Sequence, residues 1–208
     1  MLEKEQIQEY LDIALGEVYK FADSIDAKAL WAAKNLILEA EEDGGRVHVT
    51  GIGKPGHVAG YAASLFSSIG TPAYELHGTE CVHGSAGQVM SKDVVIAISN
   101  SGETVELKGT VETLKNNGAR IIGLTGNPDS WLAKKSDVTL IAGAEQEGDR
   151  MNKPPRASVL TEIIMVQTLS ILLQNERNLT LREYAKWHPG GSLGQSIRDM
   201  EAVNGFED

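Results

Sequence analysis

Apolar residues recur at three- and four-residue spacing along the first part of the chain. Ile7, Leu11, Ala14, Leu15 and Val18 follow this spacing, and no proline interrupts them. The spacing is typical of one face of an amphipathic helix. After a polar break at residues 23–26 the same pattern returns over residues 27–42 and ends at a pair of glycines. Two helices are therefore predicted before the first strand.

Beyond residue 45, short β-branched runs alternate with segments of helix length. The runs predict strands at residues 47–50, 71–76, 94–98, 121–124 and 138–141. The third run is apolar on both faces, as a central parallel strand requires. Because strands and helices alternate, the strands should pair in parallel through right-handed crossovers. The pattern predicts an α/β fold, a three-layer sandwich around a five-stranded parallel sheet of the flavodoxin-like kind.

The segment from Val159 to Leu173 is apolar almost all round. A helix of this kind needs cover on every side, and a chain this small is expected to find some of it in another subunit. No repeat, low-complexity tract or linker divides the sequence. We therefore expect one domain over residues 1–208, with the helices in 1–43, the α/β core in 44–175 and a polar C-terminal segment in 176–208.

Charge and composition narrow the possible partners. Lys and Arg number 19 against 29 for Asp and Glu, which gives a formal net charge of −10. Such a chain repels nucleic acid and anionic lipid at long range, so neither is an expected partner. No apolar run approaches the roughly 20 residues that span a bilayer, and the acidic start is unlike a secretory signal. A cytoplasmic protein is expected, with the lone Cys81 as a packing residue.

A glycine loop, GIGKPG at residues 51–56, follows the first predicted strand. It has the GxGxxG spacing of dinucleotide sites, and Glu75 stands where the ribose acid would lie. A nicotinamide enzyme normally needs a further substrate domain, however, and this chain has no room for one. Lys54 places a positive charge in the loop, where an anion would bind. We therefore favour a small anionic ligand over a dinucleotide.

The loop after the central strand reads Ser99, Asn100, Ser101, Gly102, Glu103 and Thr104. Hydroxyls, backbone amides and the positive end of a helix dipole together suit a phosphate monoester. The alternative is a helix that Ser101 caps, with Thr104 as its third residue. Capping accounts for one hydroxyl and leaves Ser99 and Asn100 unexplained, so phosphate binding is favoured. Both loops follow strands, and the carboxyl ends of strands bind ligands in open α/β sheets.

Five motifs in order carry a family resemblance: GIGKPGH, GTPAYELHGTECVHG, DVVIAISNSGETVE, GLTGNPDSWLAKKSDVTL and WHPGGSLG. They resemble the sugar isomerase (SIS) domain of the arabinose 5-phosphate isomerases, and the similarity covers residues 47–194. The resemblance implies a phosphosugar pocket and reversible aldose–ketose isomerisation through an enediol, in a homo-oligomer, a dimer or a tetramer. Such a reaction needs an acid and a base but no redox cofactor.

The resemblance also assigns site residues. It places Lys54, Glu106, Glu147 and His188 at catalytic positions, with either glutamate as the base, His188 in ring opening or proton delivery, and Lys54 against negative charge. In such enzymes a neighbouring subunit supplies the histidine, so the pocket would be composite. The expected substrate contacts are Gly53, Gly70, Thr71, His77, His83, Ser99, Asn100, Ser101, Gly102 and Thr104. Two histidines six residues apart, without a thiolate pair, predict no required metal.

Three features depart from the family pattern. His83 is followed by Gly and Ser where the family has Gly and Asp, which leaves the protonation state of His83 open. Three cations, Arg150, Lys153 and Arg156, enter a segment that is apolar in the family, and they either hold a second anion or balance an acidic surface. Many members carry a nucleotide-sensing region after the SIS domain, and none is expected in a chain that stops at Asp208.

Three functions remain to be compared. The leading one is an isomerase of a pentose 5-phosphate, and a 6-phospho-hexulose isomerase is close behind because the same loop would hold either phosphate. The chief rival is a non-catalytic phosphosugar sensor, since SIS domains also serve as binding modules in regulators. A nucleotide-dependent oxidoreductase is the third.

Overall fold

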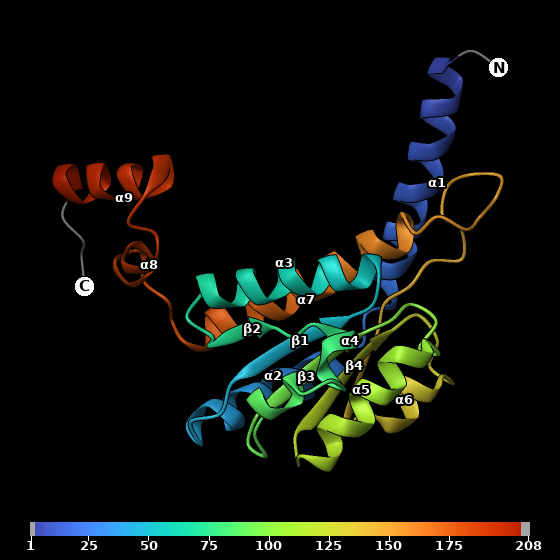
Figure 1. The fold of residues 1–208 in the computed structure, drawn as a ribbon. Helices are drawn as coiled ribbons and strands as arrows, with labels where there is room; N and C mark the ends of the chain where they lie inside the picture. Colours follow the sequence, from blue (N-terminus) through green and yellow to red (C-terminus); the bar gives the residue numbers. More distant parts are fainter. Residues whose placement is uncertain (1–2, 205–208) are drawn as a thin grey trace.

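The computed structural model describes residues 3–204, without the side chains of residues 193, 198 and 201–204 (Figure 1). Its strands form one parallel sheet in the order β2-β1-β3-β4-β5. The predicted sheet is confirmed, and no strand end differs from its prediction by more than two residues. The strands are β1 (Val47–Gly51), β2 (Ala73–Glu75), β3 (Val94–Ile98), β4 (Arg120–Thr125) and β5 (Val138–Ile141).

Helices cover both faces of the sheet, so the predicted three-layer sandwich is confirmed (Figure 1). Val94, Ile96 and Ile98 of β3 pack into one core, and Val95 and Ala97 pack into the other. This explains why the run is apolar on both faces. One face carries α2 (Ala27–Glu42), α3 (Lys54–Ser68) and α7 (Ala157–Glu176). The other carries α4 (Gly78–Cys81), the 3₁₀ turn η1 (Ser85–Gln88), α5 (Val105–Asn116) and α6 (Trp131–Lys135).

The two predicted N-terminal helices are present. The carboxylate of Asp26 ends the break between them, because it accepts hydrogen bonds from the backbone N–H groups of the first turn of α2. The helix before it, α1 (Glu3–Ser24), contacts α7, and its N-terminal half projects from the body (Figure 1). Its apolar stripe is only partly covered: Ala14 is buried, whereas Ile7 and Leu15 are exposed.

Helix α7 extends the predicted apolar segment by a few residues at each end. It is the one helix of residues 3–204 that is long and apolar enough to cross a membrane by length and composition. Half of that stretch is buried, and the helix packs against α3 with Met165, Val166 and Leu169 in the core. Its position in the fold is that of a core helix.

Two C-terminal helices were not predicted from the polar tail. They are α8 (Leu181–Trp187) and α9 (Gly191–Asn204). Thr180 and Glu183 form a capping box at the start of α8, with each side chain bonded to the backbone N–H of the other residue. The pair of helices stands away from the body, beside the amino end of β2, where the indole of Trp187 contacts Gly70 (Figure 1).

Candidate functional site

The connections reverse direction across the sheet between β1 and β3. The chain runs from β1 to β2 on one side, and from β3 through β4 to β5 on the other. Gly51 pairs with Ile98, so the carboxyl ends of these two strands are adjacent. Ligands of open α/β sheets bind at such a switch point. Here it joins the two loops, 51–53 and 99–104, that the sequence singled out.

The loop after β1 brings the N-terminus of α3 close to the sheet. A Cβ on Gly51 would lie 2.7 Å from the carbonyl carbon of Pro55, so the helix approaches this closely only because residue 51 is glycine. Gly53 takes a positive φ of 69° and begins α3 without a side-chain cap. Pro55 has no N–H, and the Gly56 N–H donates to the Gly53 carbonyl at 3.1 Å, so of the first three residues of α3 only Lys54 still offers a backbone N–H. Lys54 itself is exposed.

Within the second loop, Ser99 bonds to other loop residues. Its hydroxyl accepts from the Gly102 N–H at 3.1 Å and lies 3.0 Å from the Thr104 hydroxyl. Ser101 is exposed, and its hydroxyl accepts from the Glu103 N–H at 3.2 Å. The loop is therefore partly self-bonded in this state.

Thr104, not Ser101, is the N-cap of α5, and it makes no side-chain cap hydrogen bond. The alternative in which Ser101 caps the helix is therefore wrong. The amides of the first turn of α5, which includes Glu106, remain without a capping side chain. Two uncapped helix N-termini, those of α3 and α5, thus begin at the switch point. This arrangement favours a bound anion.

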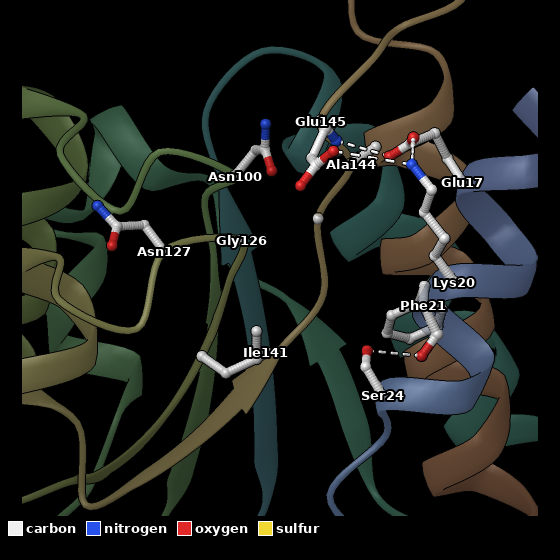
Figure 2. Close-up of a pocket in the computed structure, with 11 residues that line it drawn as sticks. Glu17, Lys20, Phe21, Ser24, Asn100, Gly126, Asn127, Ile141, Ala144 and Glu145 are labelled. Atoms are coloured by element: carbon white, nitrogen blue, oxygen red, sulfur yellow. Dashed lines mark hydrogen bonds and ion pairs between the residues drawn. The ribbon is translucent and has the colours of Figure 1, made fainter. Parts of the chain in front are cut away.

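A cavity of about 410 Å³ opens between α1 and the carboxyl ends of β3, β4 and β5 (Figure 2). Asn100 and Asn127 line it from the sheet side, and Glu17, Lys20 and Glu145 line it from α1 and the loop after β5 (Figure 2). The volume lies within the range of small-molecule sites. Its α1 residues gave no signal in the sequence, because they follow the ordinary pattern of a helix face.

Charge in this cavity is organised around Glu17. Its carboxylate accepts from Lys20 at 2.8 Å and from the Glu145 N–H at 2.7 Å, and Lys20 lies 3.7 Å from the Glu145 carboxylate. Burial acts to raise the pKa of Glu17, but the hydrogen bonds from Lys20 and the backbone outweigh it and lower the pKa. Glu17 therefore ties α1 to the loop after β5 as an ionised group.

A smaller cavity of about 310 Å³ lies between the ends of β1 and β2, lined in part by Gly53, His57, Glu75 and His77. The Nδ1 atom of His77 accepts from the Glu80 N–H at 3.4 Å, which begins α4. The neutral ring then carries its proton on Nε2. His77 thus lies at the carboxyl ends of β1 and β2, and Glu75 lines this cavity together with Gly51, Gly53 and Gly56, the glycines of the GxGxxG spacing.

Glu147 is buried at the N-terminus of α7. Its carboxylate accepts from the Arg156 N–H at 2.6 Å, the Ser158 N–H at 3.2 Å and the Ser158 hydroxyl at 2.6 Å. Arg156, the N-cap residue, offers no side-chain cap of its own. Glu147 therefore caps the N-terminus of α7 with a negative charge. To act as a base, it would have to release some of these bonds.

Comparisons with known proteins agree with this geometry. The SIS domain family matches residues 42–172. The chain belongs to the SIS domain family. The Francisella tularensis arabinose 5-phosphate isomerase KdsD is 38% identical over 178 residues, which cover 86% of this chain and 54% of that protein. The KdsD of Pseudomonas aeruginosa is 40% identical over 153 residues, 74% of this chain and 47% of that protein.

Among solved structures, the E. coli CFT073 protein c3406, in complex with arabinose 5-phosphate, superposes with a TM-score of 0.84 at 30% identity, covering 91% of this chain and 100% of that one. This SIS domain chain spans about half the length of the curated relatives it matches. Its own activity and substrate are therefore taken up as a proposal below.

His188 lies away from the switch point of its own SIS domain. It follows α8, whose Trp187 packs on Gly70 at the amino end of β2, whereas the two loops lie at the carboxyl ends (Figure 1). Gly70 and Thr71 lie at that same far edge. Within one chain, the structure thus brings Lys54, Glu106 and Glu147 to the carboxyl edge of the sheet. His188, Gly70 and Thr71 lie at the opposite edge.

The ring of His188 is nevertheless held in a fixed orientation. Its Nδ1 donates to the backbone carbonyl of Tyr184 at 2.9 Å, and the two rings stack with centroids 3.9 Å apart. Since a carbonyl only accepts, Nδ1 carries a proton, and in the neutral ring Nε2 presents a lone pair. This tautomer suits a proton acceptor.

The remaining predicted residues are at the surface. His83 is exposed beyond the C-terminal end of α4. Arg156 pairs with Asp149 at 2.6 Å and lowers the pKa of that carboxyl, and Arg150 lines a cavity of about 690 Å³ against α1. Within residues 3–204, no group of three or more His, Cys, Asp or Glu side chains is arranged to hold a metal ion.

Proposed function

We propose that the chain is a sugar-phosphate isomerase, which interconverts an aldose phosphate and a ketose phosphate through an enediol. The observation that carries this is the pair of uncapped helix N-termini, of α3 and α5, that begin at the switch point. A phosphate placed there would receive the backbone N–H of Lys54 from α3 and the first amides of α5, with the Lys54 ammonium as a counter-charge. The carbon skeleton would extend into the cavity beside Asn100.

The chemistry needs a base for the proton next to the carbonyl and a donor for the enediol oxygen. Glu106 is exposed in the first turn of α5, next to the proposed phosphate site, and is free to approach substrate. Glu147 is engaged as a helix cap. We therefore assign the proton transfer to Glu106 in the first place, with Glu147 as the second acid and Lys54 countering the charge of the enediolate.

His188 is proposed to serve the site of a neighbouring subunit. Its placement at the amino edge supports this, because α8 and α9 hold it on an arm away from its own switch point. Gly70 and the buried Thr71 lie in the body beside the same arm, so they would meet substrate only where a neighbouring subunit docks at this edge. The enzyme is therefore proposed to work as a homo-oligomer with composite sites.

A pentose 5-phosphate is the leading substrate. The names of the two KdsD relatives and the arabinose 5-phosphate in the c3406 complex support it. A hexulose 6-phosphate is the second candidate, because helix N-termini recognise the phosphate and not the length of the carbon chain.

A phosphosugar sensor without turnover is the alternative function. Two observations favour it: the hydroxyls of Ser99, Ser101 and Thr104 already bond within their loop, and Glu147 is bonded as a cap. A sensor would bind its sugar phosphate with ordinary affinity and leave the carbon-bound hydrogens in place.

Hydrogen exchange separates the two functions. Purified protein is mixed in deuterated water with arabinose 5-phosphate, ribulose 5-phosphate and hexulose 6-phosphate. Exchange of the hydrogen on the carbon next to the carbonyl, C2 of an aldose or C1 of a 2-ketose, is followed by NMR. We expect exchange with the two sugars of one aldose–ketose pair, or with the hexulose, its loss in Glu106→Gln, and its retention in Glu112→Gln, which changes an exposed glutamate of the same helix. If the protein binds a sugar phosphate but no sugar shows exchange, the function is that of a phosphosugar sensor.

A further inference from the structure

Glu162 is a buried acid that the proposed reaction does not use. It lies in the second turn of α7 with no measurable exposure, and neither carboxyl oxygen has a hydrogen-bond partner in the described part of the chain. A carboxylate in such a place loses its hydration, and no hydrogen bond or opposite charge replaces it. The neutral, protonated form is the one that this environment tolerates.

Glu162 lies close enough to Glu147 for the charge of one carboxyl to act on the other. Side chains four residues apart in a helix share a face and lean toward the helix N-terminus, so Glu162 leans toward Ser158. The Ser158 hydroxyl donates to Glu147 at 2.6 Å. The start of α7 therefore holds two buried carboxyl groups: Glu147, which accepts three hydrogen bonds, and Glu162, one turn further along the helix, which has no partner.

Glu147 is the charged group that acts on Glu162. Burial first, and the Glu147 carboxylate second, raise the pKa of Glu162 to about 8. The charged groups of the helices packed against α7, and those of the loop before it, are paired with other partners or exposed. On the helices these groups are Glu17 and Lys20 of α1, Lys34 and Glu41 of α2, which pair with residues at the far end of α7, and Lys54 and His57 of α3; in the loop, Arg156 pairs with Asp149, and Arg150 and Lys153 are exposed.

We propose that Glu162 is a positioning residue for Glu147: the two form a carboxyl pair that carries one proton at neutral pH, held by Glu162. The pair then has a single negative charge, and that charge stays on Glu147 at the N-terminus of α7. The structural part of this inference stands alone, and its catalytic part rests on the function proposed above.

The proton count follows directly. As the second acid of the proposed reaction, Glu147 would exchange a proton with the substrate oxygens: the pair is neutral while Glu147 holds that proton and carries one negative charge once Glu147 has given it up. Glu162 keeps its own proton throughout. If Glu162 ionises, two buried negative charges face each other without a cation, and the bonds of Glu147 to Arg156 and Ser158 are weakened by repulsion.

The first test measures the proton itself. In protein labelled with ¹³C at the glutamate carboxyls, NMR of the wild-type chain should show one carboxyl that titrates near pH 8. Glu162→Gln should lack this resonance, and Glu112→Gln, the exposed control, should keep it. The inference is overturned if every glutamate titrates in the ordinary acidic range, or if the alkaline titration persists in Glu162→Gln. Neither outcome depends on turnover.

The second test measures its effect on catalysis. With the sugar phosphate that exchanges, kcat of wild type should fall about tenfold for each pH unit beyond the titration of Glu162. Glu162→Gln mimics the protonated acid. Its kcat and KM at neutral pH should therefore equal those of wild type, and its kcat should not fall at alkaline pH. An unchanged fall in Glu162→Gln would refute the positioning role, even with isomerase activity established. Absence of turnover with every sugar phosphate would refute the proposed isomerase activity. The carboxyl titration of the first test would then still show whether Glu162 holds a proton beside Glu147.

Discussion

The hydroxyl of Ser158 donates to the carboxylate of Glu147 at 2.6 Å, and this bond joins the loop after β5 to the first turn of α7. The acceptor is charged and buried, which makes the bond stronger than one between neutral groups. The loop between β5 and α7 is therefore anchored by a helix cap rather than by an apolar contact.

Removing this hydroxyl should destabilise the fold. Ser158→Ala should lower the free energy of unfolding by about 1–3 kcal/mol, because one lobe of a buried carboxylate then loses its donor. Urea unfolding followed by circular dichroism measures this. The control is Ser64→Ala, at an exposed position of α3, where we expect almost no change. Equal stability of the two variants would contradict the cap.

Stability should also fall as the pH rises. The pKa of Glu162 is raised from 4.5 to about 8 in the folded chain, so the folded state binds more protons than the unfolded state between these values. Stability from this group is complete below the lower value and is lost as the pH passes through the upper one, by up to about 5 kcal/mol. Glu162→Gln should show a smaller loss in unfolding measured from pH 5 to 9. If the free energy of unfolding falls equally with pH in wild type and in Glu162→Gln, Glu162 is not the group responsible.

The composite site predicts rescue between two inactive variants. Glu106→Gln and His188→Ala should each be inactive alone. After mixing and subunit exchange, random pairing in a dimer should restore about a quarter of the wild-type activity, because some sites then combine an intact Glu106 with an intact His188. Absence of recovery, with subunit exchange demonstrated separately, would place His188 outside the site.

The turn after β3 should not tolerate a side chain at Gly102. Its φ is 65°, and a Cβ would lie 2.2 Å from the Ser130 hydroxyl oxygen. Gly102→Ala should therefore cost about 1–3 kcal/mol of stability and weaken sugar-phosphate binding. Gly87→Ala is the matched control, because nothing lies within 4 Å of a Cβ there. Thermal unfolding and ligand titration check both effects, and equal behaviour of the variants would contradict them.

Local sequence was sufficient to predict the sheet and the two loops at its switch point. Residues 94–98 are apolar without interruption because helices cover both faces of β3, and hydropathy detects that directly. The glycine and hydroxyl residues after β1 and β3 stand out for the same reason, since each serves a turn or a helix start next to its own strand.

What the sequence did not reveal depends on contacts between distant segments. Glu162 falls within a segment that reads as apolar, and its isolation becomes visible only once Glu147 is placed beside it. Glu17 looks like an ordinary helix residue until the loop at Glu145 bonds to it. The capping box of α8, with Thr180 and Glu183 three residues apart, was a local signal that the polar character of the tail obscured.

The arm formed by α8 and α9 has a consequence for how the protein performs at different concentrations. If His188 serves a neighbouring subunit as proposed, each active site exists only in the associated protein. Specific activity should then decline on dilution, and single copies at low concentration in a cell would be inactive.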